Sequence, residues 1–401
     1  MLMLNPSRIF IALMFLFISF IAIYSSRDIS CPVSPPEPSV DKYLVMDEPR
    51  ISGTKQRIVV KSLKTRRLSE IQTNQSPDYF VGDILKISGA PIAICRDDPF
   101  INYYLSKKVI YVIKYPEISK VGMVSFHSRD AFVALRRPLI NIRKYLSSNI
   151  SLALAEPLAG LVNGIIFGER GNLSSDLNSA FSRTGLTHII ALSGYNITIV
   201  IAFLSIILNR GNRRLHSMLC ISGIILFVFA TGLSASVIRA AIMGSVFLLA
   251  GFWGRRPDGV VAILFAACMM VAFNQYLLLY DVGFQLSFTA MLGVILLVPI
   301  IDPAFKLLAG FFSPYLSATL AAQIFTWPII SAEFGLFSVV APLSNLLVLP
   351  IIPITMLSGF LLAITKRVVP FLGDIFLYIV WFFSAYINKI AETLSAFSYA
   401  S

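Results

Sequence analysis

The sequence has few charged side chains and few of the residues that build metal or nucleotide sites. Only 13% of its 401 residues are charged, 56% are hydrophobic, and the mean hydropathy is +0.77. Because soluble domains carry about a quarter charged residues, this composition excludes a single soluble core and indicates a polytopic membrane protein. Three scattered histidines exclude a histidine-rich metal cluster, and no phosphate-binding loop indicates an ATPase. We therefore expect no metal and no cofactor.

Cysteine is also scarce, and its four positions fall in two kinds of segment. Cys220 and Cys268 lie in apolar runs, where cysteine usually packs as a small hydrophobic residue. Cys31 and Cys95 lie in polar sequence and can form a disulfide if that region is outside the cytoplasm. Sequence alone does not establish that their geometry fits, so the bond stays an open alternative.

The positive charge is concentrated towards the N-terminus. Residues 27–144 hold 20 Lys and Arg against 12 Asp and Glu, which accounts for eight of the net +12. Such a region either contacts a polyanion or an anionic membrane surface, or is simply a solvated lysine-rich surface.

Residues 1–29 are predicted to contain a transmembrane anchor. The sixteen residues 9–24 after Arg8 are uncharged and slightly short for a full span, and no small-x-small cleavage site of a signal peptide follows them. The next stretch, Cys31 to Ser39, holds four prolines and is typical of a stiff linker.

Residues 30–135 are predicted to form a small β domain. Residues 55–63, 79–92 and 107–118 alternate apolar and polar side chains and are separated by Gly and Pro. This pattern indicates the short strands of a barrel or sandwich, and residues 99–108 are predicted to form a short helix. Residues 136–151 then place Leu139, Ile142 and Leu146 at helical spacing, with Arg143 facing elsewhere, which favours an amphipathic helix in the membrane interface.

Residues 152–401 are predicted to form a multi-span helical domain. Residues 152–168 are apolar but include Glu156, Pro157 and Asn163, so we interpret them as a broken or re-entrant helix. The predicted spans that follow are 187–208, 215–233, 237–253, 258–274, 281–300, 316–332, 340–364 and 369–396.

The loop charges predict an orientation. The basic loops 209–214, 254–259 and 365–367 all fall on one side if the spans alternate, and the positive-inside rule places that side in the cytoplasm. The basic N-terminal domain, the loop near Tyr280 and the start of the helix at His188 are then extracytoplasmic.

Polar groups inside a membrane are costly, at about 2.5 to 3.5 kcal/mol for a central charge, and they persist mostly where they line a cavity or pair with one another. Simpler alternatives stay open: Arg239 could extend to the interface, His188 could be an interfacial histidine, and Gly194 could mark close helix packing. An intramembrane serine hydrolase is not favoured, because Ser193 and His188 are five residues apart on one helix and project in different directions. The candidates to line or brace a polar pathway are Glu156, Asn163, His188, Ser193, Gly194, Asn196, Arg239, Gln285 and Asn345.

The stretch from Glu156 to Val200 resembles the opening of the competence region in the ComEC family of DNA-uptake channels. That family has a Glu-Pro start, a Gly-acid pair, and an Arg-x-Gly phrase leading through His to Ser-Gly. The family usually continues with Leu-His where this chain has Tyr195 and Asn196. The matching positions are Glu156, Pro157, Gly168, Glu169, Arg183, Gly185, His188, Ala191, Ser193 and Gly194.

Three later phrases carry the same resemblance, at residues 236–244, 281–293 and 323–353. Upstream, residues 81–92 and 98–113 look like the small OB-type domain that many members carry. Many members also end in a metallo-β-lactamase-like domain with a His-x-His-x-Asp-His phrase, which this sequence lacks. We therefore expect the shorter, channel-only form, with no nuclease and no other enzymatic activity.

The resemblance implies a channel of the plasma (inner) membrane that passes single-stranded DNA into the cytoplasm during natural transformation. Partners would be single-stranded DNA, membrane lipid, a DNA receptor and a cytoplasmic helicase-like motor, and a homo-oligomer is left open. A channel or transporter for another polyanion is an alternative, as is an intramembrane hydrolase. Tyr79, Phe80, Tyr103 and Tyr104 are available to stack bases, although strand-core packing explains them equally well. The basic residues expected to contact phosphates are Lys55, Arg57, Lys61, Lys64, Arg66 and Arg67.

Overall fold

A computed structural model describes most of the chain as two compact units. The predicted anchor, its linker, Cys31 and Ser193 lie outside the described residues, apart from Met14 and Ile18. One unit comprises Met1–Asn141 with Cys268–Val282, and the other comprises Ile142–Ala267 with Gly283–Ser401. The described residues are Met14, Ile18 and 41–397 except 53–54, 75–76, 96–97, 99, 126–128, 170–173, 191, 193, 209–211 and 336–337.

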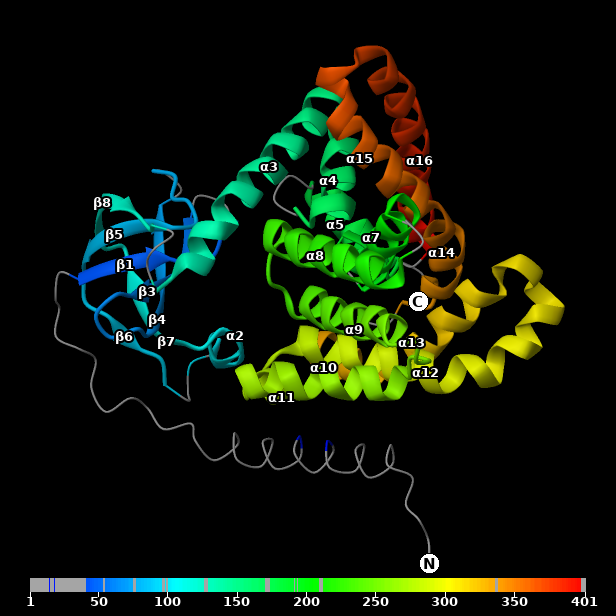
Figure 1. The fold of residues 1–401 in the computed structure, drawn as a ribbon, viewed down its shortest axis with the longest axis horizontal. Helices are drawn as coiled ribbons and strands as arrows, with labels where there is room; N and C mark the ends of the chain where they lie inside the picture. The colour runs from blue at the N-terminus through cyan, green and yellow to red at the C-terminus, as the bar shows by residue number, and fades with distance from the viewer. Residues whose placement is uncertain are drawn as a thin grey trace, which may run out of the picture. The chain divides into compact units, whose positions relative to one another are not determined.

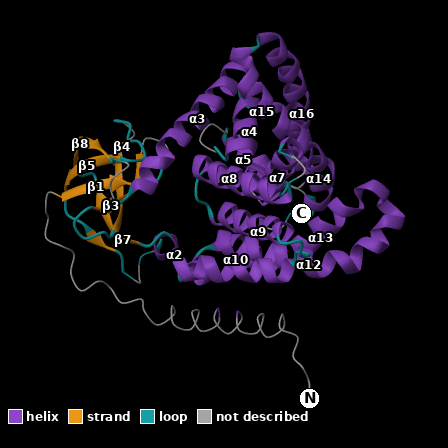
Figure 2. Ribbon diagram, in the orientation of Figure 1, coloured by secondary structure: helices purple, strands orange, loops and turns teal. Residues whose placement is uncertain are grey.

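The first unit is built on a β-sheet, coloured orange in Figure 2, and a short helix lies between two of its strands in the sequence. Residues 41–123 supply all the described strands, although those at 41–45, 50–52 and 68–74 lie outside the segments that the alternating pattern predicts. The elements are β1 (Asp41–Val45), β2 (Arg50–Ser52), β3 (Lys55–Ser62), β4 (Leu68–Asn74), β5 (Asp83–Ser88), β6 (Ile92–Ala93), α2 (Ile101–Ser106), β7 (Val109–Lys114) and β8 (Glu117–Met123).

The strand pairing closes this sheet into a five-stranded barrel. β7 and β8 are separated only by Tyr115 and Pro116, so they act as two halves of one bent strand. Its first half pairs in parallel with β4 and its second half pairs antiparallel with β5, while β1 joins β5 to β3 and β3 joins β4. This cyclic order with one parallel pair is that of an OB-type Greek-key barrel.

The period-two pattern of β3 explains which side chains fill the barrel. Its residues alternate strictly between outward and buried positions, and Ile58 and Val60 are fully buried. They pack with Val45, Ile71 and Leu85 from neighbouring strands in one apolar core. Lys55, Arg57, Val59 and Lys61 therefore point outward from the same strand.

The second unit is helical (Figure 1). The linking helix α3 (Ala131–Ala153) runs from the barrel unit into it. The other elements from residue 158 onwards, including the segment Cys268–Val282 of the first unit, are α4 (Leu158–Phe167), α5 (Ser175–Arg183), α6 (Thr187–Ile190), α7 (Gly194–Ile207), α8 (Arg213–Thr231), α9 (Ala235–Phe252), α10 (Gly259–Phe273), α11 (Leu277–Tyr280), α12 (Val282–Ala309), η1 (Gly310–Phe312), α13 (Ser313–Phe334), α14 (Ala341–Val348), η2 (Leu349–Ile351), α15 (Ile352–Val368) and α16 (Pro370–Phe397).

Each predicted span coincides with helix. Five segments are long and apolar enough to cross a membrane: Arg213–Thr231, Ala235–Phe252, Val282–Leu307, Ala341–Val368 and Pro370–Phe397. The predicted span 187–208 is instead divided into α6 and α7, and α7 is a shorter apolar helix. The fold class is confirmed as a polytopic helical membrane protein with an N-terminal β domain.

The predicted re-entrant segment forms a short helix in the middle of the helical core. All residues of α4 from Ala159 to Phe167 are buried. Ten residues extend about 15 Å, half the hydrocarbon thickness of a bilayer. This length and burial fit a helix that enters the membrane without crossing it, although the membrane placement stays a prediction.

Helix α3 begins five residues before the predicted amphipathic helix. The direction of its arginine side chains differs from the prediction. Arg136 and Arg143 are buried, whereas Phe132, Ile142 and Tyr145 are exposed. In the barrel unit, Arg136 donates to the Met46 carbonyl oxygen at 3.0 Å. Exposed apolar side chains on this helix suit a lipid interface, but its position in the membrane interface stays a prediction, and Arg143 faces inward.

We predict that Gly293→Ala destabilises the helical unit. A Cβ at Gly293 of α12 would collide with the Ala321 carbonyl oxygen and come within 3.0 Å of Phe325 on α13. Overpacking of this kind costs about 1–3 kcal/mol, so thermal unfolding of the purified protein should shift to lower temperature. The matched control is Gly251→Ala, where nothing lies within 4 Å of the added methyl. Equal melting temperatures for the two variants would contradict the close α12–α13 contact.

Candidate functional site

A row of polar side chains crosses one outer face of the barrel. Arg50 on β2 pairs in register with Arg57 on β3, and Arg57 pairs with Gln72 on β4. Gln72 in turn pairs with Lys114 on β7. The row therefore spans four strands and carries three cations that lie in register on neighbouring strands. We call this row, together with Lys55 on the same side of β3, the cationic face.

Aromatic rings accompany these cations. The Arg57 guanidinium lies 5.9 Å from the Phe100 ring centroid, and Lys55 Nζ lies 5.8 Å from that of Tyr115. Phe100 and Tyr115 are both more than half exposed, so their rings remain open to a ligand. Arg50 lies 5.9 Å from the ring of Tyr103 on α2. Side by side, cations and exposed rings can bind phosphates and stack bases.

Of the four aromatic residues that the sequence suggested for stacking, Tyr103 lies beside Arg50 and Phe80 is exposed. Tyr79 is buried in the barrel core and Tyr104 is buried under α2, so neither can stack a base. Phe100 and Tyr115 were missed because Phe100 lies just before α2 and Tyr115 lies between β7 and β8, where a sequence pattern does not fix the direction of a side chain. The pairing of Lys55 and Arg57 with them was not readable from spacing, because it joins β3 to residues more than 40 positions later.

A buried carboxylate lies beside the cationic face, on the same side of β4 as Gln72. Glu70 on β4 is fully buried, accepts a hydrogen bond from Gln72 Nε2 at 3.1 Å, and leaves Oε2 without a hydrogen bond among the described residues. Burial and the neighbouring Glu70 raise the pKa of Tyr103 to about 12, so this phenol stays protonated. Its neutral ring anchors α2 beside the face.

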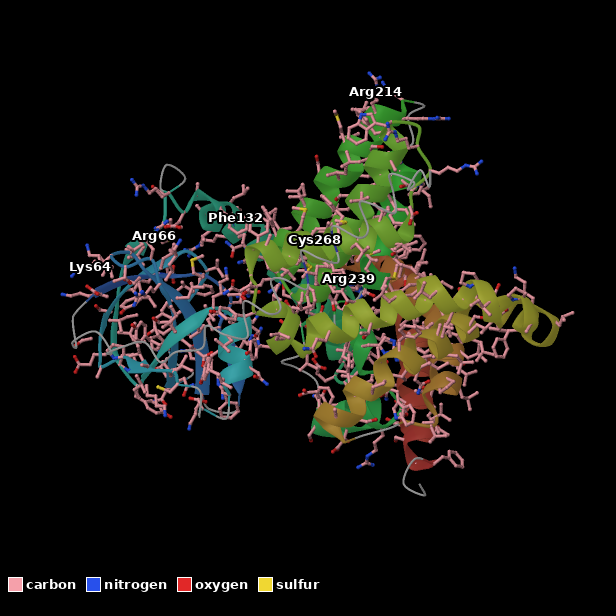
Figure 3. All side chains as sticks on the ribbon, turned by 90° about the horizontal axis from the view of Figure 1, so that it is seen from below. Lys64, Arg66, Phe132, Arg214, Arg239 and Cys268 are labelled. Carbon is pink, nitrogen blue, oxygen red and sulfur yellow. The ribbon has the colours of Figure 1, made fainter. Side chains whose placement is uncertain are left out.

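The remaining predicted DNA contacts lie towards the other end of β3 and are largely engaged within the protein. Asp130 holds Lys61 at 3.0 Å and Arg66 at 2.5 Å, and Arg67 donates to the Tyr111 hydroxyl at 2.9 Å. Lys64 is exposed on the β3–β4 turn, where Figure 3 shows it with Arg66 at the edge of the barrel. The six predicted residues thus form two groups. Lys55 and Arg57 lie at the start of β3, and the other four lie near its end or in the turn that follows.

In the helical unit, the predicted polar residues are mostly buried. Asn163, Asn196, Arg239 and Asn345 are each at most 7% exposed, which excludes them from an open aqueous surface. Asn163 Nδ2 donates to Ser151 Oγ at 3.0 Å. The carbonyl oxygens of the Asn163 and Asn345 side chains have no hydrogen-bond partner among the described residues.

The residues that begin α7 connect three neighbouring elements. Asn196 Nδ2 donates to the Ile165 carbonyl oxygen at the end of α4 at 2.9 Å, and the Tyr195 hydroxyl donates to Leu349 in η2 at 3.3 Å. A Cβ on Gly194 would come within 2.9 Å of Arg239 Nη2 on α9. Gly194 therefore allows a close approach of the guanidinium to the start of α7.

The other candidates do not join this cluster. Glu156 Oε2 accepts from the Gly160 amide at the far end of α4, and the exposed His188 has Nδ1 2.9 Å from the Gly185 carbonyl oxygen. Gln285 is half-buried on α12, and Asn345 lies on α14. The structure thus brings Gly194 and Arg239 together, while Asn196 in the same turn of α7 bonds to α4 and Asn163 faces Ser151 of α3.

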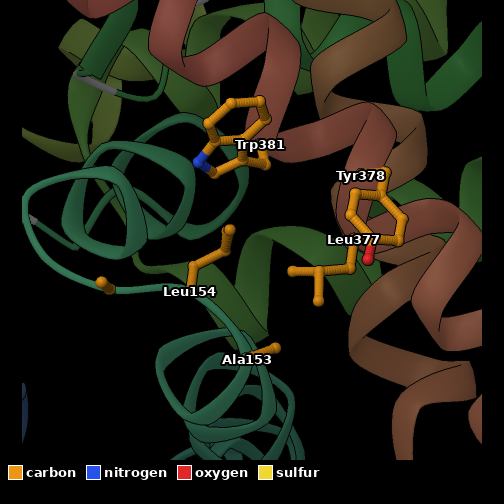
Figure 4. A pocket seen from close by; sticks show the side chains of 6 residues that line it. Ala153, Leu154, Leu377, Tyr378 and Trp381 are labelled. Carbon is orange, nitrogen blue, oxygen red and sulfur yellow. The ribbon is translucent and has the colours of Figure 1, made fainter.

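A cavity of about 260 Å³ opens elsewhere in the helical unit (Figure 4). It is lined by Ala153, Leu154 and Ala155 from the α3–α4 connection and by Leu377, Tyr378 and Trp381 from α16. Its lining is apolar and contains none of the candidate polar residues. This cavity is suited to an apolar group and does not mark a polar pathway.

Comparison with known proteins decides the family. A family model described as competence protein matches residues 165–401, more than half of the chain. The chain belongs to the competence protein family. The matched region begins within α4 and takes in α7, α9, α12 and α14, which carry Asn196, Arg239, Gln285 and Asn345.

Two relatives extend this competence family match. The ComE operon protein 3 of Bacillus subtilis is 29% identical over 223 residues, 55% of this chain and 28% of that protein. An uncharacterized protein of Aquifex aeolicus is 28% identical over 308 residues, 72% of this chain and 71% of the relative. No solved structure matches the chain. The competence family and the five long apolar helices together indicate a multi-pass membrane protein.

We predict that Asp130→Asn lowers the stability of the barrel unit at neutral pH only. Burial works to raise the pKa of Asp130, but hydrogen bonds from Arg66 and Lys61 hold it below its usual value. A depressed folded-state pKa stabilises the protein above the unfolded pKa of about 3.9, and this stabilisation is lost as pH falls through the folded-state value. Hydrogen bonds to charged groups contribute about 1.5–3 kcal/mol.

Thermal unfolding of both proteins from pH 7 to pH 2.5 tests this prediction. The wild-type protein should melt higher at pH 7, and the two curves should converge as the pH falls below the unfolded pKa of about 3.9. A constant difference across this range would show that Asp130 acts by packing rather than by charge.

Proposed function

We propose that this competence family protein is an inner-membrane channel for the uptake of single-stranded DNA into the cytoplasm. The observation that carries the proposal is the cationic face with its exposed rings, on an OB-type barrel in the same chain as a competence-family membrane region. Cations and aromatic platforms on such barrels bind single strands with little sequence preference. We further propose that Lys55 and Arg57 contact phosphates while Phe100 and Tyr115 stack bases.

The contacts of the barrel unit support an extracytoplasmic position for the barrel. Asn274 Nδ2 donates to the Ser106 carbonyl oxygen of α2 at 2.7 Å, and both residues belong to this unit. The connection from α10 to α12 that contains Asn274 is the one that the positive-inside rule places outside. The barrel would then meet incoming DNA before the membrane does.

Within the helical unit, we propose that the cluster at the start of α7 braces and partly lines the passage. The buried guanidinium of Arg239 is costly in an apolar helical unit unless polar substrate or water reaches it, and Asn163 and Asn196 brace the helices through hydrogen bonds. Transport energy would come from a partner such as a helicase-like motor, because the sequence carries no recognisable nucleotide-binding loop. A DNA receptor and other competence proteins are further proposed partners.

A channel for a different polyanion remains the second candidate, since the cationic face recognises phosphate or sulfate equally well. The exposed rings favour nucleic acid over other polyanions. Aromatic rings stack on bases, but they do not attract the negative charges of an anionic polymer. We propose no catalytic step.

We predict that Phe100→Ala weakens binding of an oligothymidylate by about 5- to 150-fold, since stacking one base is worth about 1–3 kcal/mol. Arg57→Ala should also weaken binding and reduce the slope of log affinity against log salt by about 0.7. Fluorescence anisotropy with full-length protein in detergent measures both effects.

The matched control is Lys64→Ala, which also removes an exposed cation of the barrel. Lys64 lies in the turn beyond the other end of β3, and the strand itself extends about 23 Å from Lys55 to Ser62 at about 3.3 Å per residue. Lys64→Ala should change the affinity for the oligothymidylate by less than about twofold, because an exposed cation away from the bound strand contributes little. A larger loss for Lys64→Ala than for Arg57→Ala would place the interface at the β3–β4 turn instead.

The channel itself is tested in a naturally transformable host from which the gene has been deleted. Labelled DNA should still bind at the surface but fail to enter the cytosol, and transformants should fall to background. Complementation with the wild-type chain should restore both. Normal entry of DNA into the cytosol without this protein would contradict the proposed function.

A further inference from the structure

Arg239 is a buried cation that has no counter-ion in the part of the chain that the structure describes. Its side chain is 7% exposed, and no acidic side chain among the described residues lies within salt-bridge distance. Figure 3 shows it among the packed helices, whereas Arg214 extends from the outer end of α8. Because arginine cannot be deprotonated in proteins, its charge persists and must be compensated where it lies.

The present partners of Arg239 compensate this charge only weakly. Nε donates to Ser287 Oγ at 2.7 Å, and Nη1 lies 3.6 Å from Met243 Sδ. The guanidinium carbon is 5.8 Å from the Phe288 ring centroid. A hydroxyl, a thioether and a ring face each supply partial negative charge, and Nη2 has no hydrogen-bond partner among the described residues.

That Nη2 group points at the start of α7. An ideal Cβ on Gly194 would lie 2.9 Å from Nη2 and 3.8 Å from the guanidinium carbon. The first amides of a helix have no partner within the helix, and its dipole adds about half a positive charge there. A guanidinium beside these amides is electrostatically unfavourable unless an anion is shared between them.

We propose that Arg239 and the first turn of α7 bind one phosphate-type oxyanion, the phosphodiester group of a DNA strand in transit. Nη2 and the α7 amides donate to its oxygens, while Ser287 holds the guanidinium in orientation. The identity of the ligand rests on the proposed function, whereas the oxyanion site rests on the geometry alone. Gly194 is required because any larger residue occupies the space between the guanidinium and the helix.

Hydrogen exchange of the α7 amides in the full-length protein tests the site. The protein is held in a maltoside detergent, which carries no phosphate, and inorganic phosphate is compared with chloride at equal ionic strength. At phosphate ten times above the dissociation constant, the first-turn amides of wild-type α7 should exchange about tenfold more slowly. Arg239→Gln should abolish this protection, and Gly194→Ala should weaken it with all charges retained.

Arg214→Gln is the matched control, because it removes an exposed guanidinium that lies 5.6 Å from the Phe252 ring centroid. It should leave the protection intact. Arg239→Lys retains the positive charge and should retain part of the protection. This variant distinguishes loss of the oxyanion site from loss of the fold in Arg239→Gln. Equal protection in wild type and Arg239→Gln, or loss of protection in Arg214→Gln, would overturn the site.

The source of the oxyanion is tested by three further ligands. An oligothymidylate should protect the α7 amides, whereas its uncharged methylphosphonate analogue should not. Protection by an anionic phospholipid but not by the oligothymidylate would overturn the DNA assignment. If DNA uptake proves independent of this chain while phosphate still protects α7 through Arg239, the proposed function fails and the oxyanion site stands. If uptake requires the chain but Arg239→Gln leaves both uptake and protection unchanged, the site fails alone.

Discussion

The helical unit depends on satisfying backbone carbonyl groups where its helices are interrupted in an apolar environment. Interrupted helices expose carbonyl oxygens, and no water in the hydrocarbon layer can bind them. Here side chains from neighbouring helices donate to them: Asn196 to Ile165 at the end of α4, and Ser344 to Thr184 at the end of α5. Tyr195 does the same for η2. These bonds hold the short helices α4, α7 and α14 together and allow buried polar groups to persist between them.

This constraint gives a structural reason for the phrase that identifies the family. Ser338 donates to the Arg183 carbonyl oxygen at 2.5 Å, and the left-handed Gly185 packs so closely on Ala341 that a Cβ would approach within 2.6 Å. The Arg-x-Gly part of the phrase therefore docks on α14, while Gly194 admits Arg239. Tyr195 and Asn196 replace the usual Leu-His of the family, yet both side chains donate across helix boundaries. Their polarity is used for bracing, and an imidazole is not needed for that purpose.

The barrel unit shows how a uniform basic sequence becomes two different surfaces. β3 and the turn after it carry cations along their whole length, but Asp130 engages Lys61 and Arg66 at one end. Lys55 and Arg57 lie at the other end beside exposed rings, without such a carboxylate partner among the described residues. Charge count alone could not separate them, because Asp130 comes more than 60 residues later in the chain. The neutralised end supports the fold, and the cationic face remains available for a ligand.

The sequence by itself determined the membrane class, the positions of the helices and the existence of a small β domain, because these depend on local hydrophobicity and period. The phrases around Arg183, His188 and Arg239 also sufficed for the family. Only the tertiary structure decided which polar residues meet. Arg143, at a position expected to face away from the core, turns inward to Glu169 at 3.2 Å, and Gly194 meets Arg239 from another helix. Closure of the barrel through the bent β7–β8 strand could not be predicted from the sequence either. Hydrogen bonds between strands that are far apart in the chain produce no periodic pattern of residues.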